Sequence, residues 1–207
     1  MQHEDLLVEF AAGALSPAAS LLVATQAGLR PDVRASLADL DAVGGALLSR
    51  SDAAAPEEGA LERVLERIDQ ESGSPLPAAG DGRPAALRDF FGGTLTADKW
   101  RTLIPGMRYA AIPEFTTPDC LTRLVSLKAG RAIPRHTHKG MELTLVLSGG
   151  YEDETGRFDV GDVAIADPEI EHQPRVDDDA DCICLTVEEG GMLIRRPIVE
   201  FVRYFLQ

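Results

Sequence analysis

Apolar residues recur at helical spacing through residues 1–71 of the chain. Members of each stripe lie three or four positions apart, which is the period of one face of an α-helix. The four stripes are Leu6, Leu7, Phe10 and Ala11; Ala19, Leu22 and Val23, continued by the polar Gln26; Val33, Leu37, Leu40 and Val43; and Leu61, Val64, Leu65 and Ile68. Gly13 and Gly28 are expected to end the first two helices, and Ser16 and Pro31 to begin the next two. The pattern predicts four short amphipathic helices in a small bundle or an open layer.

A different pattern begins at about residue 88, where short apolar runs are bounded by Gly, Asp or Pro. Such runs at this spacing are typical of an antiparallel sandwich or barrel. The expected strands cover residues 108–112, 121–127, 143–147, 162–165 and 182–187. Residues 72–86 lack an apolar stripe and are rich in Ser, Gly and Pro. The sequence therefore predicts an α+β protein of two domains: a helical domain at 1–71, a linker at 72–86 and an all-β domain at 87–207.

The predicted helical domain is small and acidic. About seventy residues provide only a thin hydrophobic core, so we expect a partner or a ligand to complete it. Acidic side chains clearly outnumber basic ones in residues 1–71. This excess fits a solvated outer face, and it also fits an acidic surface that clamps a basic protein.

Charge and composition narrow the classes of function. The chain of 207 residues has a formal net charge of −14, which argues against direct binding to nucleic acid or to anionic membranes. No stretch approaches the ~20 apolar residues that span a bilayer. The acidic start of the chain does not resemble a secretory signal, and three cysteines without a CxxC pair fit a reducing compartment. We therefore expect a cytoplasmic protein.

The strongest chemical signal is the spacing Gly130-x5-His136-x-His138-x3-Glu142-x6-Gly149. Residues two apart on a strand face the same side, so His136 and His138 can reach one ion together. The turn at 139–140 then returns Glu142 alongside them. Further along, a strand that opens at Gly161 leads to His172, which is expected to add a fourth ligand from a neighbouring strand. The alternative is a set of ordinary surface histidines.

Three imidazoles and one carboxylate suit Zn²⁺, with Fe²⁺, Mn²⁺ and Ni²⁺ as alternatives. Four protein ligands in a tetrahedron favour zinc in a closed, structural site, whereas an octahedral iron site with open positions favours oxygen chemistry. The remaining histidine, His3, lies far from the others in the sequence and is expected to be exposed.

The spacing from Gly130 to Gly149 resembles the first motif of the cupin family, and the spacing from Gly161 to His172 resembles the second. The second motif departs from the usual pattern: the proline is displaced to Pro168, Glu169 replaces a glycine, and Val176 stands where asparagine is usual. The histidine spacing is intact. The resemblance implies a cupin barrel for residues 87–207, with the metal bound by His136, His138, Glu142 and His172.

A helical domain followed by a cupin domain resembles the ChrR family of anti-sigma factors over nearly the whole chain. The stretches that carry the resemblance are residues 22–25, 40–45, 142–147 and 181–185. It implies a transcriptional regulator whose helices hold a group IV (extracytoplasmic-function) sigma factor inactive, and whose cupin domain takes part in a response to singlet oxygen or related oxidants. Zinc-binding anti-sigma domains carry His-x3-Cys-x2-Cys, but the matching positions here are Gln26, Arg30 and Val33. We therefore expect one metal per chain, in the cupin domain only.

Two cysteines and several acidic residues are further candidates. Cys182 and Cys184 alternate on one predicted strand and should face the same side, where they are either redox-sensitive thiols or small buried hydrophobes. The acidic run at residues 152–154 is interpreted as a solvated turn. Glu171, beside His172, is a candidate general base if the protein is an enzyme.

Three functions remain open on the sequence alone. The first is the anti-sigma factor with a sensing cupin domain. The second is a metal-dependent cupin enzyme such as a dioxygenase, which needs open coordination positions and a general base. The third is a non-catalytic ligand-binding or scaffold protein. Homo-oligomerisation is also open.

Overall fold

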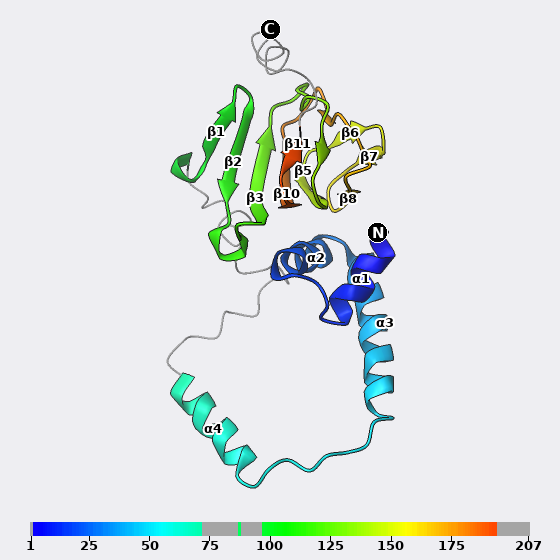
Figure 1. Ribbon diagram of the computed structural model, residues 1–207, viewed down its shortest axis with the longest axis vertical. Coiled ribbons are helices and arrows are strands. Elements are labelled where there is room, and N and C mark those ends of the chain that lie inside the picture. The colour runs from blue at the N-terminus through cyan, green and yellow to red at the C-terminus, as the bar shows by residue number, and fades with distance from the viewer. Residues whose placement is uncertain (1, 72–86, 88–96, 194–207) are drawn as a thin grey trace.

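The computed structural model describes residues 2–71, 87 and 97–193, and these ranges form a helical domain beneath a β domain (Figure 1). The predicted linker at 72–86 lies outside the described residues, as do 88–96 and 194–207 of the predicted β domain. The α+β class and the order of helices before strands agree with the prediction. Among the described helices, none is both long and apolar enough to cross a bilayer.

Within the described ranges, the first domain contains the four expected helices: α1 (His3–Ala11), α2 (Pro17–Leu29), α3 (Pro31–Leu48) and α4 (Ala60–Glu71). Ser16 caps α2, because its hydroxyl accepts a hydrogen bond from the backbone N–H of Ala19 at 3.2 Å. The predicted end of this helix at Gly28 is wrong, since the helix continues for one more residue. It ends there because Pro31 restricts Arg30 to an extended conformation.

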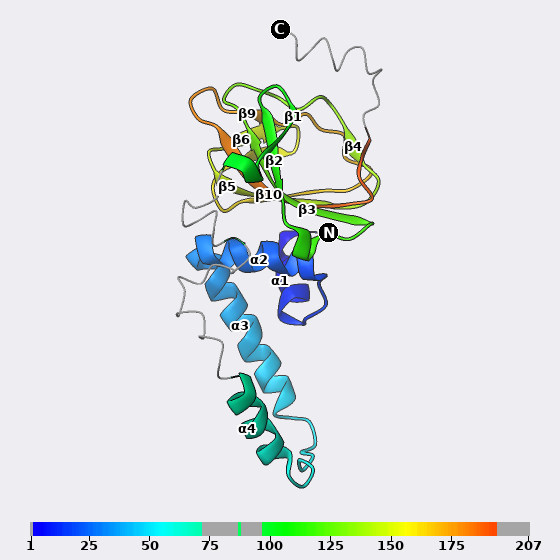
Figure 2. The same cartoon turned by 90° about the vertical axis from the view of Figure 1, so that its left-hand side faces the viewer.

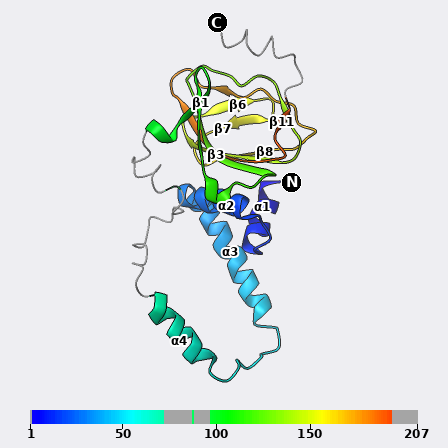
Figure 3. The same ribbon diagram turned by 60° about the vertical axis from the view of Figure 1, so that its left-hand side comes forward.

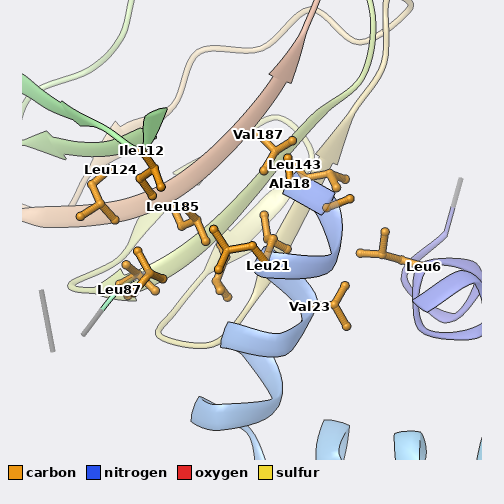
Figure 4. Packing of buried hydrophobic residues seen from close by; sticks show 14 of the residues in the cluster. Leu6, Ala18, Leu21, Val23, Leu87, Ile112, Leu124, Leu143, Leu185 and Val187 are labelled. Carbon is orange, nitrogen blue, oxygen red and sulfur yellow. The ribbon is translucent and has the colours of Figure 1, made fainter. Parts of the chain in front are cut away.

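Helix α2 is enclosed on both sides. Its buried residues include the stripe predicted from the sequence and also residues on the opposite face. Ala18 and Leu21 point toward the sheet of the β domain, whereas Val23 points toward Leu6 of α1 (Figure 4). A helix that is apolar nearly all round is expected in such a central position.

Helix α4 stands apart from the other three helices (Figures 1 and 3). Helices α1, α2 and α3 pack against one another, so the predicted set of four is a packed layer of three helices and one separate helix. The apolar stripe of α4 is exposed to solvent along its whole length.

The β domain contains eleven strands within residues 97–193. They are β1 (Arg101–Ile104), β2 (Met107–Ala111), β3 (Cys120–Leu127), β4 (Thr137–His138), β5 (Glu142–Ser148), β6 (Tyr151–Asp153), β7 (Gly156–Phe158), β8 (Val163–Ala166), β9 (Arg175–Val176), β10 (Cys182–Glu189) and β11 (Met192–Leu193). The five predicted strands correspond to β2, β3, β5, β8 and β10, with small differences at their ends. The others have two to four residues and are defined by their pairing partners rather than by a sequence pattern.

The strands form antiparallel sheets that surround the interior of the domain (Figure 2). The largest has the order β1-β2-β3-β10-β5-β8, and smaller sheets are formed by β7-β6-β9 and by β11-β4. Gly149 turns the chain between β5 and β6 with a φ of 70°. A Cβ at this position would lie 2.4 Å from the carbonyl oxygen of Asp181, so the turn requires glycine, which the last position of the sequence motif supplies.

Alternate residues of β5 and β10 separate two hydrophobic cores. Leu143 and Leu145 belong to the cluster shared with helices α1–α3, whereas Val146 belongs to the cluster inside the β domain. Leu185 of β10 also lies in the shared cluster, and Cys184 in the interior one. The outer face of the large sheet therefore completes the thin core of the helical domain.

Candidate metal centre

The four predicted ligands come from three neighbouring segments of the β domain. His136 and His172 face each other in an isolated antiparallel bridge, in which each backbone N–H donates to the carbonyl of the other at 3.0 Å. His138 is the second residue of β4, and Glu142 is the first residue of β5. The turn between them passes close to another segment, because a Cβ at Gly140 would lie 2.9 Å from a backbone carbonyl oxygen. Pairing of short segments thus sets the positions of these side chains.

The side chains converge on a single point. Nε2 of His172 lies 3.1 Å from Nε2 of His136 and 3.1 Å from Nε2 of His138. Oε2 of Glu142 lies 3.3 Å from Nε2 of His138 and 4.0 Å from Nε2 of His172. One candidate ligand atom from each of the four residues lies within 4.8 Å of the others. The structure therefore brings together all four residues that the sequence singled out.

The Nε2 atoms of His136 and His172 point their lone pairs at each other. Nδ1 of His136 lies 2.8 Å from the carbonyl oxygen of Pro134, and Nδ1 of His172 lies 2.8 Å from Oδ2 of Asp153. Since a carbonyl and a carboxylate can only accept, each Nδ1 carries the proton and each Nε2 is left without one. Two lone pairs 3.1 Å apart, with a carboxylate beside them, repel one another unless a cation lies between them.

Burial keeps His136 and His138 neutral. It lowers the pKa of His136 to about 3 and that of His138 to about 4, and the neighbouring His172 contributes to both shifts. Neutral imidazole is the form that binds a metal ion. Burial and the Glu188 carboxylate raise the pKa of Glu142 to about 7, so a cation at this point would favour its ionised form.

The spacing of the candidate ligand atoms fits a metal ion. In a tetrahedral site with bonds of about 2.0–2.1 Å, the ligand atoms are about 3.4 Å apart. The observed separations of 3.1, 3.3 and 4.0 Å lie around this value. The buried cluster of His136, His138, Glu142 and His172 could thus hold one metal ion.

Asp153 is a site residue that the sequence interpretation missed. Residues 152–154 were expected to form a solvated turn, but the side chain of Asp153 is fully buried and contacts Nδ1 of His172. Although burial opposes the shift, hydrogen bonds from His172 and Thr155 lower the pKa of Asp153. The alternation along β6, with buried Tyr151 two residues earlier, is the signal that places this side chain inside.

A cavity in the barrel interior adjoins the candidate metal site. Its lining includes three of the four candidate ligands, His136, Glu142 and His172, and four sulfur-containing side chains: Met107, Cys182, Cys184 and Met192. The Sγ atoms of Cys182 and Cys184 are 3.5 Å apart, so the two residues face the same side as predicted. The contact with Cys182 and burial raise the pKa of Cys184 well above its ordinary value, so its thiol is protonated at neutral pH. By contrast, Glu171 is exposed.

Comparison with known proteins places the chain in a family. It is 41% identical over 206 residues to the anti-sigma-E factor ChrR of Cereibacter sphaeroides, covering 99% of this chain and 96% of that protein. The chain belongs to the ChrR family of anti-sigma factors. The family model of the ChrR cupin-like domain matches residues 92–190.

A solved ChrR structure extends the agreement to the fold. The chain superimposes on ChrR from the crystal structure of Rhodobacter sphaeroides SigE in complex with the anti-sigma ChrR, with a TM-score of 0.74 and 42% identity. The match covers 91% of this chain and 97% of that ChrR chain. The resemblance to the ChrR family and the cupin fold of the second domain are therefore confirmed.

Zinc-binding anti-sigma domains carry their metal ligands at the positions that match Gln26, Arg30 and Val33. In this chain the first two of these residues contact the β domain. Gln26 is only 2% exposed, and its Nε2 donates to the carbonyl oxygen of Gly161 at 3.0 Å. Arg30 forms an ion pair of 2.7 Å with Asp162, just before β8. The third position, Val33, is buried in the hydrophobic core.

His3 also belongs to this region, and the expectation that it is exposed is wrong. It is only partly exposed, and its Nε2 lies 2.9 Å from Oε1 of Gln26. The amide of Gln26 therefore links α1 to the β domain by using its donor and its acceptor at once.

Proposed function

We propose that this protein is an anti-sigma factor that binds an extracytoplasmic-function sigma factor through its helical domain, in the cytoplasm, and that its metal-bound cupin domain senses oxidants. The observation that carries the proposal is the exposed apolar face of α4, in a chain whose solved relative was crystallised with SigE. Binding of this face to the sigma factor blocks the surface that the sigma factor offers to RNA polymerase.

The apolar face of α4 is large for an exposed helix. Leu61 is 65%, Val64 53% and Leu65 50% exposed, and the three residues lie at i, i+3 and i+4. Their neighbours on the helix are mostly charged, so the helix is sharply divided into an apolar and a polar face. Exposed apolar faces of this kind mark protein-binding surfaces, because burying them in a partner is favourable.

The end of α3 adds a second exposed apolar surface. Val43 is 57% and Leu47 62% exposed, one turn apart on the half of α3 that extends beyond the packed layer. The N-terminal half of the helix is different, because Val33 and Leu37 are buried against α1 and α2. Two such surfaces support a partner that contacts both helices, as a sigma factor of two domains would.

Zinc is the metal that we propose for the cupin domain, with His136, His138, Glu142 and His172 as its ligands. Three imidazoles and one carboxylate at near-tetrahedral spacing support zinc over iron, since a tetrahedral shell filled by four protein ligands keeps no position free for oxygen, whereas an octahedral iron shell would keep open positions. When bound, zinc supplies cohesion between β4, β5 and the segment around His172. The ligands are contributed by segments that pair over only a few residues, so their fixed arrangement depends on that ion.

The cavity beside this cluster supports an oxidant-sensing role. Thioethers and thiols are side chains that oxidants convert to polar products, and here they line the same interior as the proposed zinc ligands. Oxidation at Cys182 or Cys184 would place a polar group in the hydrophobic core inside the barrel, on the inner face of β10. The outer face of β10 packs against the helical domain. A change in the barrel would thereby alter the docking of the helices.

The test of the proposal is the affinity of the full chain for the extracytoplasmic-function sigma factors of its source organism. Titration calorimetry should detect one sigma factor that binds at a ratio of one to one. Leu61→Glu combined with Leu65→Glu should weaken this binding at least about 30-fold, because central apolar anchors typically contribute about 2 kcal/mol or more.

The matched control changes the other face of the same helix. Glu62→Gln combined with Glu66→Gln should leave the affinity nearly unchanged, since solvent-exposed charges at the rim of an interface contribute little to the binding free energy. A chain that binds none of these sigma factors, or one whose α4 variant binds as tightly as the unmodified chain, would overturn the proposal.

A further inference from the structure

Glu188 is a buried carboxylate inside the β domain whose charge is only partly compensated. Its side chain is 1% exposed, and Oε2 accepts a hydrogen bond from Nη2 of Arg123 at 2.6 Å. The other oxygen, Oε1, has no hydrogen-bond partner in the part of the chain that the structure describes. Buried acceptors without a partner are rare, because each costs the free energy of its lost hydration.

The nearest nitrogen to this oxygen belongs to a proposed zinc ligand. Nδ1 of His138 is likewise buried and has no hydrogen-bond partner among the described residues. It lies 3.9 Å from Oε1 of Glu188, which is about 1 Å beyond a normal hydrogen bond. Two unsatisfied atoms of complementary character therefore face each other across a short gap.

The other two histidines of the cluster show what is missing at His138. Nδ1 of His136 has the carbonyl of Pro134 at 2.8 Å, and Nδ1 of His172 has the carboxylate of Asp153 at 2.8 Å. Each of these partners fixes the ring so that Nε2 points inward. Glu188 lies beside Nδ1 of His138 as these two acceptors lie beside the other rings, but its Oε1 is 3.9 Å away instead of 2.8 Å.

We propose that the Arg123–Glu188 pair is the outer partner of His138, and that Nδ1 of His138 donates a hydrogen bond to Oε1 of Glu188 when the metal is bound at Nε2. This inference rests on the proposed metal site. A cation at Nε2 draws electron density from the ring and makes the Nδ1 proton a stronger donor, so the carboxylate is attracted to it. Arg123 holds the second oxygen and keeps Glu188 in place, which makes Glu188 a positioning residue rather than a ligand.

The place of Glu188 on β10 gives this hydrogen bond a route to the helical domain. Glu188 lies opposite Glu142 in the register of β10 and β5. The preceding residue, Val187, faces outward and lies in the core shared with α1–α3, as does Leu143 beside Glu142 (Figure 4). Loss of the metal would release Glu188 from His138 at a position one residue from this interface.

Nuclear magnetic resonance of the full-length protein tests the hydrogen bond directly. In the zinc-loaded protein, Nδ1–H resonances of three histidines should be visible and exchange slowly with water. In Glu188→Gln, only the resonance of His138 should move, because a neutral amide oxygen is a weaker acceptor than a carboxylate. Zinc affinity, measured by competition with a coloured chelator, should fall about 10- to 100-fold in the same variant.

The matched control is Asp181→Asn, which makes the same chemical change just before β10 and removes the ion pair of Asp181 with Lys128. It should leave both the zinc affinity and the His138 resonance unchanged. Failure of the unmodified protein to bind zinc would overturn the metal site and this inference together. Zinc binding with equal affinity in the unmodified protein and in Glu188→Gln, with an unmoved His138 resonance, would overturn the inference alone.

If Glu188→Gln does not fold, the nuclear magnetic resonance spectrum of the unmodified zinc-loaded protein tests the hydrogen bond between His138 and Glu188. A slowly exchanging Nδ1–H of His138 that shows a coupling to the Glu188 carboxylate would support the proposal. A His138 ring that lacks this proton, or exchanges it rapidly while those of His136 and His172 are protected, would contradict it.

Discussion

Two polar clusters in this protein satisfy their hydrogen-bonding groups in different ways. The barrel cluster contains His136, His138, Glu142 and His172. The interdomain cluster contains His3, Gln26, Arg30, Gly161 and Asp162. In the interdomain cluster His3, Gln26 and Arg30 pair directly with complementary groups, whereas in the barrel cluster lone pairs and a carboxylate converge with too few donors between them. A cation satisfies the barrel cluster, and direct hydrogen bonds satisfy the other.

The comparison shows which feature of buried histidines indicates a metal. Burial alone is insufficient, because Gln26 is as deeply buried as the histidines and has a protein partner at each of its side-chain polar atoms. The decisive feature is the hydrogen-bond partner of Nδ1, the ring nitrogen that points away from the centre of the cluster. When Nδ1 donates to an acceptor, as in His136 and His172, the inner nitrogen is left as an acceptor and points at its neighbours.

Replacing one ligand of the barrel cluster should have the largest effect. Structural zinc contributes about 10–16 kcal/mol in zinc-finger peptides, so one of four ligands accounts for about 3 kcal/mol or more. We therefore expect His172→Asn to weaken zinc binding at least about 100-fold in a competition assay with a chelator. Gln26→Ala, which changes the interdomain cluster, should leave zinc affinity unaltered. Similar losses in both variants would show that the clusters are not independent.

The tight contact between the domains should be sensitive to a single methyl group. A Cβ at Gly161 would lie 2.6 Å from Cγ of Arg30, and the φ of 90° disfavours any other residue. We expect Gly161→Ala to lower the free energy of unfolding by about 2 kcal/mol in urea titrations.

Gly191→Ala is the control for backbone strain, because its φ of 88° is nearly the same and nothing lies within 4 Å of the added Cβ. It should cost about 1 kcal/mol less than Gly161→Ala. Equal losses would mean that Arg30 moves aside without cost.

Acid should destabilise the metal-free protein through the barrel cluster. The pKa values of His136 and His138 lie below their ordinary value, so the unfolded chain takes up protons that the folded chain does not as pH falls from 6.5 toward 4. The raised pKa of Glu142 acts in the opposite direction between about 7 and 4.5, because the folded chain then holds the extra proton. The loss of stability from the two histidines is larger than the gain from the one carboxyl group. The free energy of unfolding should therefore fall by about 1–2 kcal/mol between pH 6.5 and 5.

Urea titrations of the chelator-treated protein at both pH values measure this effect. The decrease should be smaller in His136→Asn, which lacks one of the two titrating rings. A metal-free protein that is equally stable at the two pH values would contradict the account of buried neutral histidines.

The ion pair of the interdomain cluster should have the smallest effect. The side chains of Arg30 and Asp162 are 38% and 36% exposed, so solvent screens their attraction. A double-mutant cycle of Arg30→Gln and Asp162→Asn should give a coupling free energy of about 0.5 kcal/mol that declines in high salt. A coupling above about 2 kcal/mol would show that this pair, rather than apolar packing, joins the domains.

Much of the fold could be predicted from the sequence, because strong periodicity identifies elements that bury one face. The long strands β3, β5 and β10 and all four helices follow from their apolar patterns. Strands β4, β9 and β11 have two residues each, too few for any period, and are defined only by their partners in the fold. The docking of α2 on the sheet was likewise not predicted, since apolar residues on its second face do not say what will cover them.

The candidate metal site was predictable because its ligands form a compact spacing in the sequence. Its outer partners were not, because they come from distant strands: Asp153 from β6, Glu188 from β10 and Arg123 from β3. Asp153 and Glu188 stand in acidic runs that are commonly solvated, and only the register of the strands places their side chains inside.

X-ray absorption spectroscopy of the purified 207-residue chain tests whether the barrel cluster binds zinc. We expect one zinc ion per chain, with a shell of nitrogen and oxygen at about 2.0–2.1 Å and no sulfur. Absence of metal after exposure to zinc, a sulfur shell at about 2.3 Å, or a second equivalent of tightly bound zinc would contradict it.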